Sequence, residues 1–253
     1  MIESFEKTKL AGSIASGALD EVNNIIKPGI STVEIDKLCY QFINDHKAFS
    51  APLYYRGFPK SCCTSTNHVV CHGIPSEKIL NDGDIVNVDV TAVKDGWHGD
   101  TSRMFIVGEC SVKAKKLIKI TYTAMMKAIE TIKANVKIGN IGYTIQKSVE
   151  AEGFSVVRDF CGHGIGKKFH ESPNVLHYGE KNSGQELKEG MIFTVEPMIN
   201  SGKFETKTLK DGWTAVTKDK SLSAQFEHTV GVTKEGYEIF TLSKKGLNFP
   251  PNL

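Results

Sequence analysis

The residues of this sequence that most directly suggest chemistry are acids placed in or beside apolar runs. Asp89 and Glu196 each follow strand-forming residues, so each is expected in a buried strand. A charged carboxylate in such a place is costly unless it is paired or bound to a metal. Two buried acids could share a proton. Asp100 and Glu227 also stand where apolar strands begin, and a set of four is hard to accommodate by proton sharing.

One histidine, His163, would add a nitrogen ligand to these oxygens. Two divalent cations would cancel the four negative charges and leave room for a bridging water or hydroxide. Oxygen-rich ligands with a single nitrogen and no thiolate favour Mn²⁺, Fe²⁺ or Co²⁺ over a closed structural zinc. Taken singly, each residue is more simply a solvated or salt-bridged side chain, so the set carries the prediction. The predicted ligands of a dinuclear hydrolytic site are Asp89, Asp100, His163, Glu196 and Glu227.

A predicted β-hairpin over residues 84–105 would bring two of the acids together. Asp95-Gly96 is a strong signal for a two-residue turn. With that turn, Thr91 pairs with Asp100, and Asp89 lies on the same face, diagonal to Asp100. Diagonal neighbours in an antiparallel pair are about 7–8 Å apart, within joint reach of one ion. A bulge would change this register.

The helical patterns occur twice in the same order. Apolar spacing predicts a helix from Ile2 to Ile25, and the capping-box pattern at Ser31 begins a second helix. In the second part of the chain, a helix is predicted over 117–136 and a shorter one over about 141–151. Each long helix is followed by a Lys-containing stop that includes glycine, and then by a short helix.

The strand patterns repeat as well, which predicts the fold class. Residues 80–89 align with 187–196, with Leu, Gly, Ile and Val in matching places and an acid at the end; His72-Gly-Ile aligns with His163-Gly-Ile. We interpret this as an internal duplication. The expected fold is α/β (α+β), with a central antiparallel sheet covered by helices and a cleft shared by two pseudo-twofold halves. We predict one domain over residues 1–253, with halves of about 1–110 and 111–253.

Composition excludes several other classes of protein. Hydrophobic content of 40% and charged content of 24% are globular values. A net charge of +2 is too balanced for a nucleic-acid-binding footprint, and neither a signal peptide nor an apolar membrane span is recognisable. Six cysteines without a CxxC motif fit a reducing compartment, which predicts the cytoplasm.

Five long motifs make the sequence similar to the type I methionine aminopeptidases of the pita-bread fold. Together they cover most of the chain after residue 50. They are YRGFPKSCCTSTNHVVCHGIP (55–75), DGDIVNVDVTAVKDGWHGDTSRMF (82–105), GHGIGKKFHESP (162–173), EGMIFTVEPM (189–198) and DGWTAVTKDKSLSAQFEHTVGVT (211–233).

The resemblance implies separate roles for the metal ligands. Asp89 would chelate one metal, Asp100 and Glu227 would bridge both, and His163 and Glu196 would hold the other. Glu196 would also carry the proton during attack by the bridging hydroxide. The implied activity is removal of the initiator methionine from nascent proteins and peptides, with a small second residue preferred.

The resemblance also assigns residues to the substrate. His72 and His170 would approach the substrate amide and stabilise the tetrahedral intermediate. From the residues alone, His72 could equally be a metal ligand or a substrate contact, and His170 could be a surface-loop residue. An apolar pocket for the thioether would be lined by Tyr55, Phe58, Cys63, Phe169 and Trp213. Phe58 stands where many relatives have tyrosine, which removes a hydroxyl and keeps the ring.

The spacing of the predicted ligands indicates the subtype, and the extent of the motifs helps to decide between the alternative functions. Glu196 and Glu227 are too close for the helical insertion of type II enzymes, and no zinc-finger extension precedes the domain, so the short bacterial or organellar form is expected. The alternatives are a proline-specific aminopeptidase or prolidase, for whose extra domain there is no room, and a non-catalytic binding module, which would typically lack some ligands. A third alternative is a ribosome- or RNA-associated factor that uses the lysines at 207–220, but such a run of lysines more simply forms a solvent-exposed face. The expected partners are N-terminal methionine and, transiently, the ribosome, with no membrane, no specific nucleic acid and a monomeric state.

Overall fold

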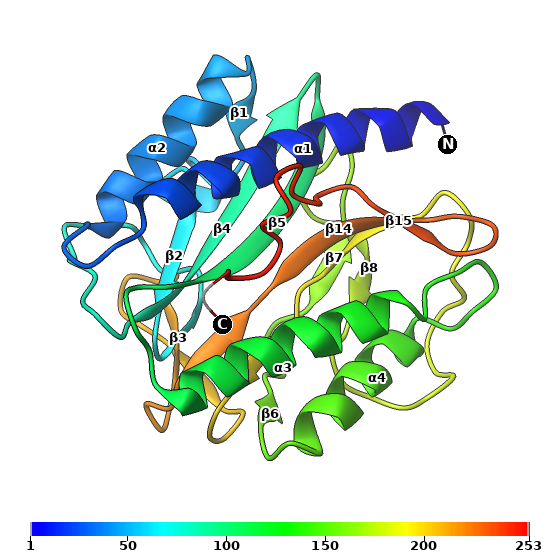
Figure 1. The fold of residues 1–253 in the computed structure, drawn as a ribbon. Helices are drawn as coiled ribbons and strands as arrows, with labels where there is room; N and C mark the ends of the chain where they lie inside the picture. Colours follow the sequence, from blue (N-terminus) through cyan, green and yellow to red (C-terminus); the bar gives the residue numbers. More distant parts are fainter. Residues whose placement is uncertain (1, 252) are drawn as a thin grey trace.

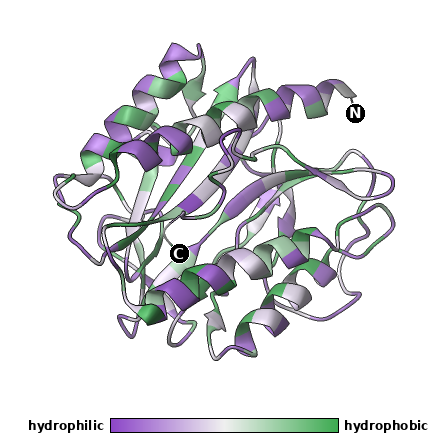
Figure 2. Ribbon diagram, in the orientation of Figure 1, coloured by the Kyte–Doolittle hydropathy of each residue, from purple (hydrophilic) through white to green (hydrophobic). Residues whose placement is uncertain are grey.

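A computed structural model of the chain describes residues 2–251 and 253, and its central feature is a twisted antiparallel sheet flanked by two pairs of helices (Figure 1). The first pair is α1 (Ile2–Ile25) and α2 (Thr32–Asp45), and the second is α3 (Val112–Ile129) and α4 (Gly139–Glu150). All four helices mix hydrophilic and hydrophobic residues along their length, as helices with one buried face do (Figure 2).

In the described part of the chain the main sheet has the strand order β1-β4-β5-β14-β9-β7-β8, with β2 also paired to β4 and β15 to β14. Two smaller sheets have the orders β13-β10-β6 and β11-β12-β3. The bounds are β1 Phe49–Ser50, β2 Cys63–Thr66, β3 Val69–Cys71, β4 Ile85–Lys94, β5 Trp97–Ile106, β6 Ser155–Val156, β7 Gly162–Gly164, β8 Glu171–Val175, β9 Ile192–Val195, β10 Met198–Asn200, β11 Thr206–Thr208, β12 Ala215–Thr217, β13 Ser223–Gln225, β14 Glu227–Val232 and β15 Tyr237–Ile239, with a 3₁₀ turn, η1, at Tyr55–Gly57.

The strand order is the same on both sides of the β5–β14 pair. Moving outward, β4 and β2 follow β5, while β9 and β7 follow β14. Helices α1 and α2 precede the strands of one side in sequence, and α3 and α4 precede those of the other. This order is what a duplication would produce, and the division near residue 110 stays a prediction.

The hairpin of β4 and β5 has the register predicted from its turn. Asp95 and Gly96 both have left-handed backbone angles, with φ of 51° and 78°, as a type I′ turn requires. Thr91 pairs with Asp100, and pairing continues without a bulge over all ten residues of each strand. Because successive side chains alternate between faces, Asp89 lies on the opposite face from Val88 and Val90.

Two hydrophobic cores attach the helix pairs to the sheet. One is formed by α1 and α2 with Val86, Val88 and Val90 of β4. The other joins α3 and α4 to Phe193 of β9 and Val230 of β14. Each core packs against the sheet face that carries these apolar side chains, so the acids on the other face are left free to meet one another.

Helix limits agree with the sequence patterns except at α3. The capping box at Ser31 is present: the Glu34 carboxylate accepts hydrogen bonds from the Ser31 backbone N–H at 2.8 Å and from its hydroxyl at 2.7 Å. The predicted helix over 117–136 is displaced, because α3 starts where the Ser111 hydroxyl caps the N–H of Ala114 and ends at Ile129. Asn135, with φ of 67°, is left-handed and lies in the following loop.

Within the described residues, none of the helices has both the length and the apolarity needed to cross a membrane.

Candidate metal centre and substrate cavity

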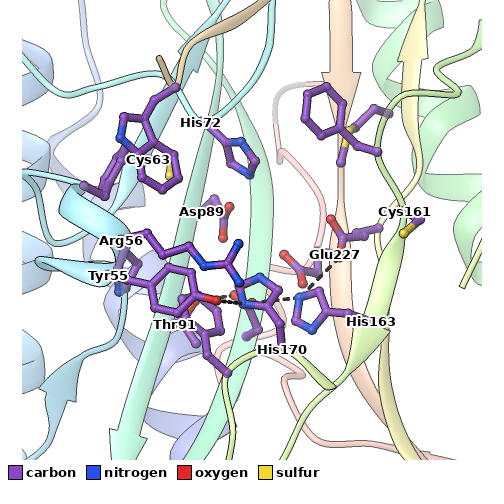
Figure 3. Close-up of a pocket in the computed structure, with 18 of the residues that line it drawn as sticks. Tyr55, Arg56, Cys63, His72, Asp89, Thr91, Cys161, His163, His170 and Glu227 are labelled. Atoms are coloured by element: carbon purple, nitrogen blue, oxygen red, sulfur yellow. Dashed lines mark hydrogen bonds and ion pairs between the residues drawn. The ribbon is translucent and has the colours of Figure 1, made fainter. Parts of the chain in front are cut away.

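Strand pairing places three of the predicted ligands around one serine. Ser102 on β5 pairs with Asp89 on β4 and also with Glu227 on β14. Paired residues face the same side of a sheet, and Asp100 lies two residues from Ser102 on the same strand. The three carboxylates therefore face one cavity from three adjacent strands (Figure 3).

The other two predicted ligands enter from β7 and the end of β9. Glu196 follows Val195, whose partner on β14 is His228, so Glu196 lies across from Glu227. The His163 backbone N–H donates to the Thr194 hydroxyl at 3.0 Å. All five predicted ligands line the same cavity, which has a volume of about 530 Å³.

The side-chain geometry of His163 leaves a nitrogen facing the acids. Its Nδ1 is 3.1 Å from the carbonyl oxygen of Gly164, which assigns the ring proton to Nδ1. Its Nε2 lies 3.7 Å from both Asp100 Oδ2 and Glu196 Oε1. These separations exceed a normal hydrogen bond, and they suit atoms that share a cation.

The donor set fits divalent metal ions. Ligand atoms of Asp100, His163 and Glu227 all lie within 4.8 Å of one another. Oε1 of Glu227 is buried and, among the described residues, has no hydrogen-bond partner. A buried carboxylate oxygen without a donor is costly, and a cation at this point would remove the cost.

Burial shifts the pKa values of the acids upward. It raises the pKa of Glu196 to about 8 and that of Asp100 to about 7, with hydrogen bonds from Thr194 and Thr91 opposing the rise. Burial, together with repulsion from Asp100 and Glu196, holds the pKa values of Asp89 and Glu227 well above their usual range. Without a counter-charge the cluster therefore resists full ionisation at neutral pH.

Several neighbouring side chains hold the acids in place. The Thr91 hydroxyl donates to Asp100 Oδ1 at 2.7 Å, and the Thr194 hydroxyl donates to Glu196 Oε1 at 2.7 Å. Glu196 also has its backbone N–H bonded to His177 Nε2 at 3.1 Å. Such second contacts fix the orientation of a ligand and tune its basicity.

Two threonines connect the two central strands reciprocally. The Thr101 hydroxyl on β5 donates to the carbonyl oxygen of Glu227 at 2.7 Å. The Thr229 hydroxyl on β14 donates to the carbonyl oxygen of Asp100 at 2.7 Å. Each strand thus fixes the main chain beside an acid of the other strand.

The remaining predicted site residues line the same cavity. Phe58 packs edge-on to Trp213 with ring centroids 5.2 Å apart, and Tyr55 packs edge-on to Phe169 at 4.9 Å. Cys63 is buried beside them, with its thiol pKa raised well above the usual value by burial. These side chains form an aromatic, soft-lined pocket next to the acids.

The two histidines assigned to the substrate lie on either side of the acids. His72 contacts Phe160 and Trp213 edge-on, and burial lowers its pKa. Nδ1 of His170 is 3.0 Å from the Tyr55 hydroxyl, and burial, with repulsion from His163, lowers the pKa of His170 to about 3. Both imidazoles are therefore neutral at pH 7.

Strand pairing corrects the proposed equivalence of His72 and His163. When β4 and β9 are aligned through Leu80 and Leu187, Val86 matches Phe193. Val86 pairs with Thr66 on β2, and Phe193 pairs with Gly164 on β7. His163 therefore matches Ser65, and His72 belongs to the segment after β3. The two His-Gly-Ile segments therefore do not occupy equivalent positions in the two halves, although both histidines line the same cavity.

Other residues of the cavity were not foreseen from the sequence. Phe160 and Met198 add apolar surface, while Arg56, Asp159 and Asn174 add polar groups. Phe160 and Met198 lie next to or within the predicted motifs, which was a usable signal. His177, which supports Glu196 from behind, stands in no motif, and no sequence pattern pointed to it.

Comparison with known proteins identifies the class. Metallopeptidase family M24 matches the chain over residues 6–234, and the chain belongs to this family. A methionine aminopeptidase of Rickettsia prowazekii is 57% identical over 250 residues, covering 98% of this chain and 96% of that protein. The crystal structure of methionine aminopeptidase from Rickettsia prowazekii superposes with a TM-score of 0.95 at 56% identity, covering 96% of this chain and 98% of that one. The fold is thus the pita-bread fold that the sequence predicted.

A more distant structure shows the same fold alone. The prolidase from Pyrococcus furiosus has a TM-score of 0.77 at 22% identity, and the match covers 96% of this chain but 65% of that one. The prolidase is therefore longer than the matching region. At this identity the likeness indicates the fold and carries no information on substrate.

Proposed function

We propose that this protein is a methionine aminopeptidase that releases the N-terminal methionine from nascent proteins and peptides. One observation carries the proposal: four carboxylates and a histidine face the same 530 Å³ cavity as a pocket of aromatic and sulfur-containing side chains. An unbranched thioether side chain suits such a pocket. The high identity to methionine aminopeptidases over nearly the whole chain supports the same conclusion.

The proposed ligands are Asp89, Asp100, His163, Glu196 and Glu227, holding two divalent cations, with Mn²⁺, Fe²⁺ or Co²⁺ preferred by this donor set. Such ions would supply a nucleophile at neutral pH and polarise the scissile carbonyl. Asp100 and Glu227 lie between the two flanks of the site and would contact both ions, with Asp89 on one side and His163 and Glu196 on the other.

Glu196 would transfer the proton during hydrolysis. Its two carboxylate oxygens have different partners, because Thr194 donates to Oε1 at 2.7 Å and Gln225 is 3.4 Å from Oε2. In this role the carboxylate accepts a proton from the attacking water and passes it to the departing amine. Glu196→Gln, which keeps the shape and loses the basicity, should abolish turnover; near-normal turnover with metal bound would refute the role.

His170 and His72 would bind the reacting amide. The Tyr55 hydroxyl can donate to Nδ1 of His170, which leaves the ring proton on Nε2, directed into the cavity. A neutral imidazole in this tautomer can donate a hydrogen bond to the oxyanion of the tetrahedral intermediate. His72, on the opposite wall, would contact the peptide on the other side of the scissile bond.

The substrate explains the proposed surroundings of the enzyme. A nascent chain is presented in the cytoplasm as it leaves the ribosome, so we infer a cytoplasmic protein that contacts the ribosome transiently. The six cysteines are all unpaired, as is usual in a reducing compartment.

The test is a metal add-back assay. Chelator-stripped protein is supplied with Mn²⁺, Fe²⁺ or Co²⁺ under anaerobic conditions and offered Met-Ala-Ser, Leu-Ala-Ser and Met-Pro-Ala. We expect metal-dependent release of methionine, with Leu-Ala-Ser cut poorly. Glu189→Gln, which changes an exposed acid outside the cavity, is the control and should retain activity.

Two outcomes would contradict the proposal. Comparable release of leucine would refute the methionine pocket and leave the metal site standing. Lack of activity with every metal, in protein whose circular dichroism shows it folded, would favour a non-catalytic binding module.

A further inference from the structure

The rim of the cavity carries an arginine with no acidic partner. Arg56 lies in η1, is exposed and lines the cavity. Its guanidinium carbon is 5.4 Å from the centroid of the Tyr55 ring, and Figure 3 shows the side chain extending across the site toward His170. Within the described residues, Arg56 has no carboxylate within salt-bridge distance.

The backbone around Arg56 is constrained in a costly conformation. Tyr54 and Arg56 have φ of 66° and 49°, and Gly57 has φ of 87°. A non-glycine residue costs roughly 1–2 kcal/mol in this left-handed region. The turn is closed by a hydrogen bond from the Tyr54 N–H to the Phe58 carbonyl at 2.8 Å and one from the Phe58 N–H to the Tyr55 carbonyl at 2.9 Å. The turn therefore holds Arg56 and Tyr55 at a fixed place on the rim.

The two acids of the rim, Asp159 and Glu171, do not form an ion pair with Arg56. Asp159 accepts a hydrogen bond from the Thr206 hydroxyl. The carboxylate of Glu171 points toward Gly166, since a Cβ built at Gly166 would lie 3.2 Å from Oε1 of Glu171. When two divalent cations balance the four acids of the centre, Arg56 is left on the rim as a cation without a paired carboxylate.

The substrate of an aminopeptidase has a defined order in such a cavity. This inference rests on the proposed function, in which the first side chain occupies the aromatic pocket and the scissile amide lies at His170. The next residues must leave through the mouth of the cavity. Tyr55 lies between the position of the scissile amide and the mouth of the cavity, because its hydroxyl contacts His170 and its ring packs against the Arg56 guanidinium.

We propose that Arg56 forms a binding subsite for a carboxylate in the third residue of the substrate, so that the protein prefers methionyl peptides with an acidic residue at this position. A guanidinium pairs with a carboxylate through two parallel hydrogen bonds. The site is open to solvent, so the preference is moderate and weakens as salt is added.

The experiment compares amidated peptides that differ at one position. The metal-loaded enzyme is offered Met-Ala-Asp-Ala-NH₂, Met-Ala-Asn-Ala-NH₂ and Met-Ala-Lys-Ala-NH₂. We expect kcat/KM for the Asp peptide to exceed that for the Asn peptide by roughly tenfold, mainly through a lower KM, with the Lys peptide slowest. Met-Ala-Ala as free acid and as amide separates a side-chain carboxylate from a chain-terminal one, and a preference for the free acid alone would overturn the assignment to a side chain.

Variants then assign the preference to one residue. Arg56→Gln should bring the Asp/Asn ratio close to one, and Arg56→Lys should retain part of it. Lys167→Gln is the matched control, because Lys167 is an exposed cation over Trp97 that does not line the cavity, and it should keep the wild-type ratio.

Three outcomes would overturn the inference. They are equal rates on the Asp and Asn peptides, an unchanged ratio in Arg56→Gln, or an equal loss in Lys167→Gln. Release of methionine without charge discrimination would refute this inference and leave the proposed function intact, whereas no release from any peptide would refute both.

Discussion

The two sides of the proposed metal centre hold their acids in different ways. On one side, β4 and β5 pair without interruption over ten residues each and carry Asp89 and Asp100 within the strands. On the other side, Glu196 lies just beyond the end of β9, and Glu227 is the first residue of β14. The short side chains are on the long, regular hairpin, and the long side chains are at strand ends.

The difference has a physical reason. A regular strand fixes the direction of a side chain, so an aspartate with few rotatable bonds needs little further support. A glutamate at a strand end has one more torsion and a less constrained main chain. Glu196 accordingly has three supporting residues, Thr194, Gln225 and His177. Glu196 is thus positioned by hydrogen bonds where the two aspartates are positioned mainly by a regular strand. Oε1 of Glu227, in contrast, has no hydrogen-bond partner among the described residues.

The largest expected effect comes from removing an acid that would contact both ions. Asp100→Asn and Glu227→Gln should each lower kcat/KM by at least roughly a thousandfold, or about 4 kcal/mol. If both acids belong to one centre, the two losses are similar although the acids lie on different sides. A loss confined to one variant, measured on Met-Ala-Ser with metal content determined, would contradict a shared centre.

The supporting threonines should reveal the difference between the sides. Thr194→Val and Thr91→Val each remove one 2.7 Å hydrogen bond to an acid. Loss of such a contact costs roughly 10- to 100-fold in metal affinity or activity. We expect the upper part of this range for Thr194→Val and the lower part for Thr91→Val, because the Thr194 hydroxyl bonds both Glu196 and the His163 N–H, whereas Thr91 bonds Asp100. Thr→Ser at each position should restore function, and an equal loss at both positions would contradict the comparison.

The acids of both sides together predict a pH dependence of stability without metal. In the unfolded chain, Asp and Glu carboxyl groups have their ordinary pKa values of 3.8 and 4.5, whereas burial in the folded chain raises the pKa of Asp100 to about 7 and of Glu196 to about 8. Histidines such as His163 and His170, whose pKa values burial lowers to about 4 and about 3, act in the opposite direction near their unfolded value of 6.5. Between pH 7.25 and 8 the unfolded histidines are mostly neutral, so the folded chain binds more protons than the unfolded one through its acids, and stability falls as pH rises.

The size of this fall is at most about 1.4 kcal/mol per pH unit for each carboxyl group that stays protonated. Denaturant titrations of metal-free protein at pH 7.25 and 8 measure it, with metal-loaded protein as the control, since bound cations remove the penalty. A stability that rises over this interval without metal would contradict the assignment of buried, uncompensated acids.

The smallest expected effect concerns the pocket wall. Phe58 is buried and packs edge-on to Trp213 at 5.2 Å. Phe58→Tyr adds one hydroxyl and keeps the ring, so KM for Met-Ala-Ser should change by no more than about threefold, whereas Phe58→Ala should raise it by roughly tenfold or more. An equal effect of both substitutions would show that the ring does not line the methionine pocket.

The sequence predicted features set by local chemistry. The Asp95-Gly96 turn determines the register that places Asp89 diagonal to Asp100, and Ser31 with Glu34 determines the start of α2. The charge of the four acids by itself indicates bound cations. In each case a few neighbouring residues contain the needed information.

Features set by tertiary packing were not predicted. The predicted end of the third helix was wrong by seven residues, from 136 to 129, because the apolar pattern continues beyond Ile129 into buried Ile132 although the chain has left the helix. The equivalence of His72 with His163 failed because strand pairing, which joins residues distant in sequence, decides it. His177 reaches the site through the fold alone, whereas Arg56 stands beside Tyr55 in the motif 55–75, so its place at the cavity could have been predicted.

The most direct test is an anaerobic titration of metal-free protein with Mn²⁺, followed by electron paramagnetic resonance. A centre built from both sides, with Asp100 and Glu227 contacting both ions, predicts two tightly bound Mn²⁺ per chain and the signal of a spin-coupled pair. Glu227→Gln should convert it to the signal of isolated ions. A wild-type protein that saturates with one Mn²⁺, or with two that show no coupling, would contradict the dinuclear site.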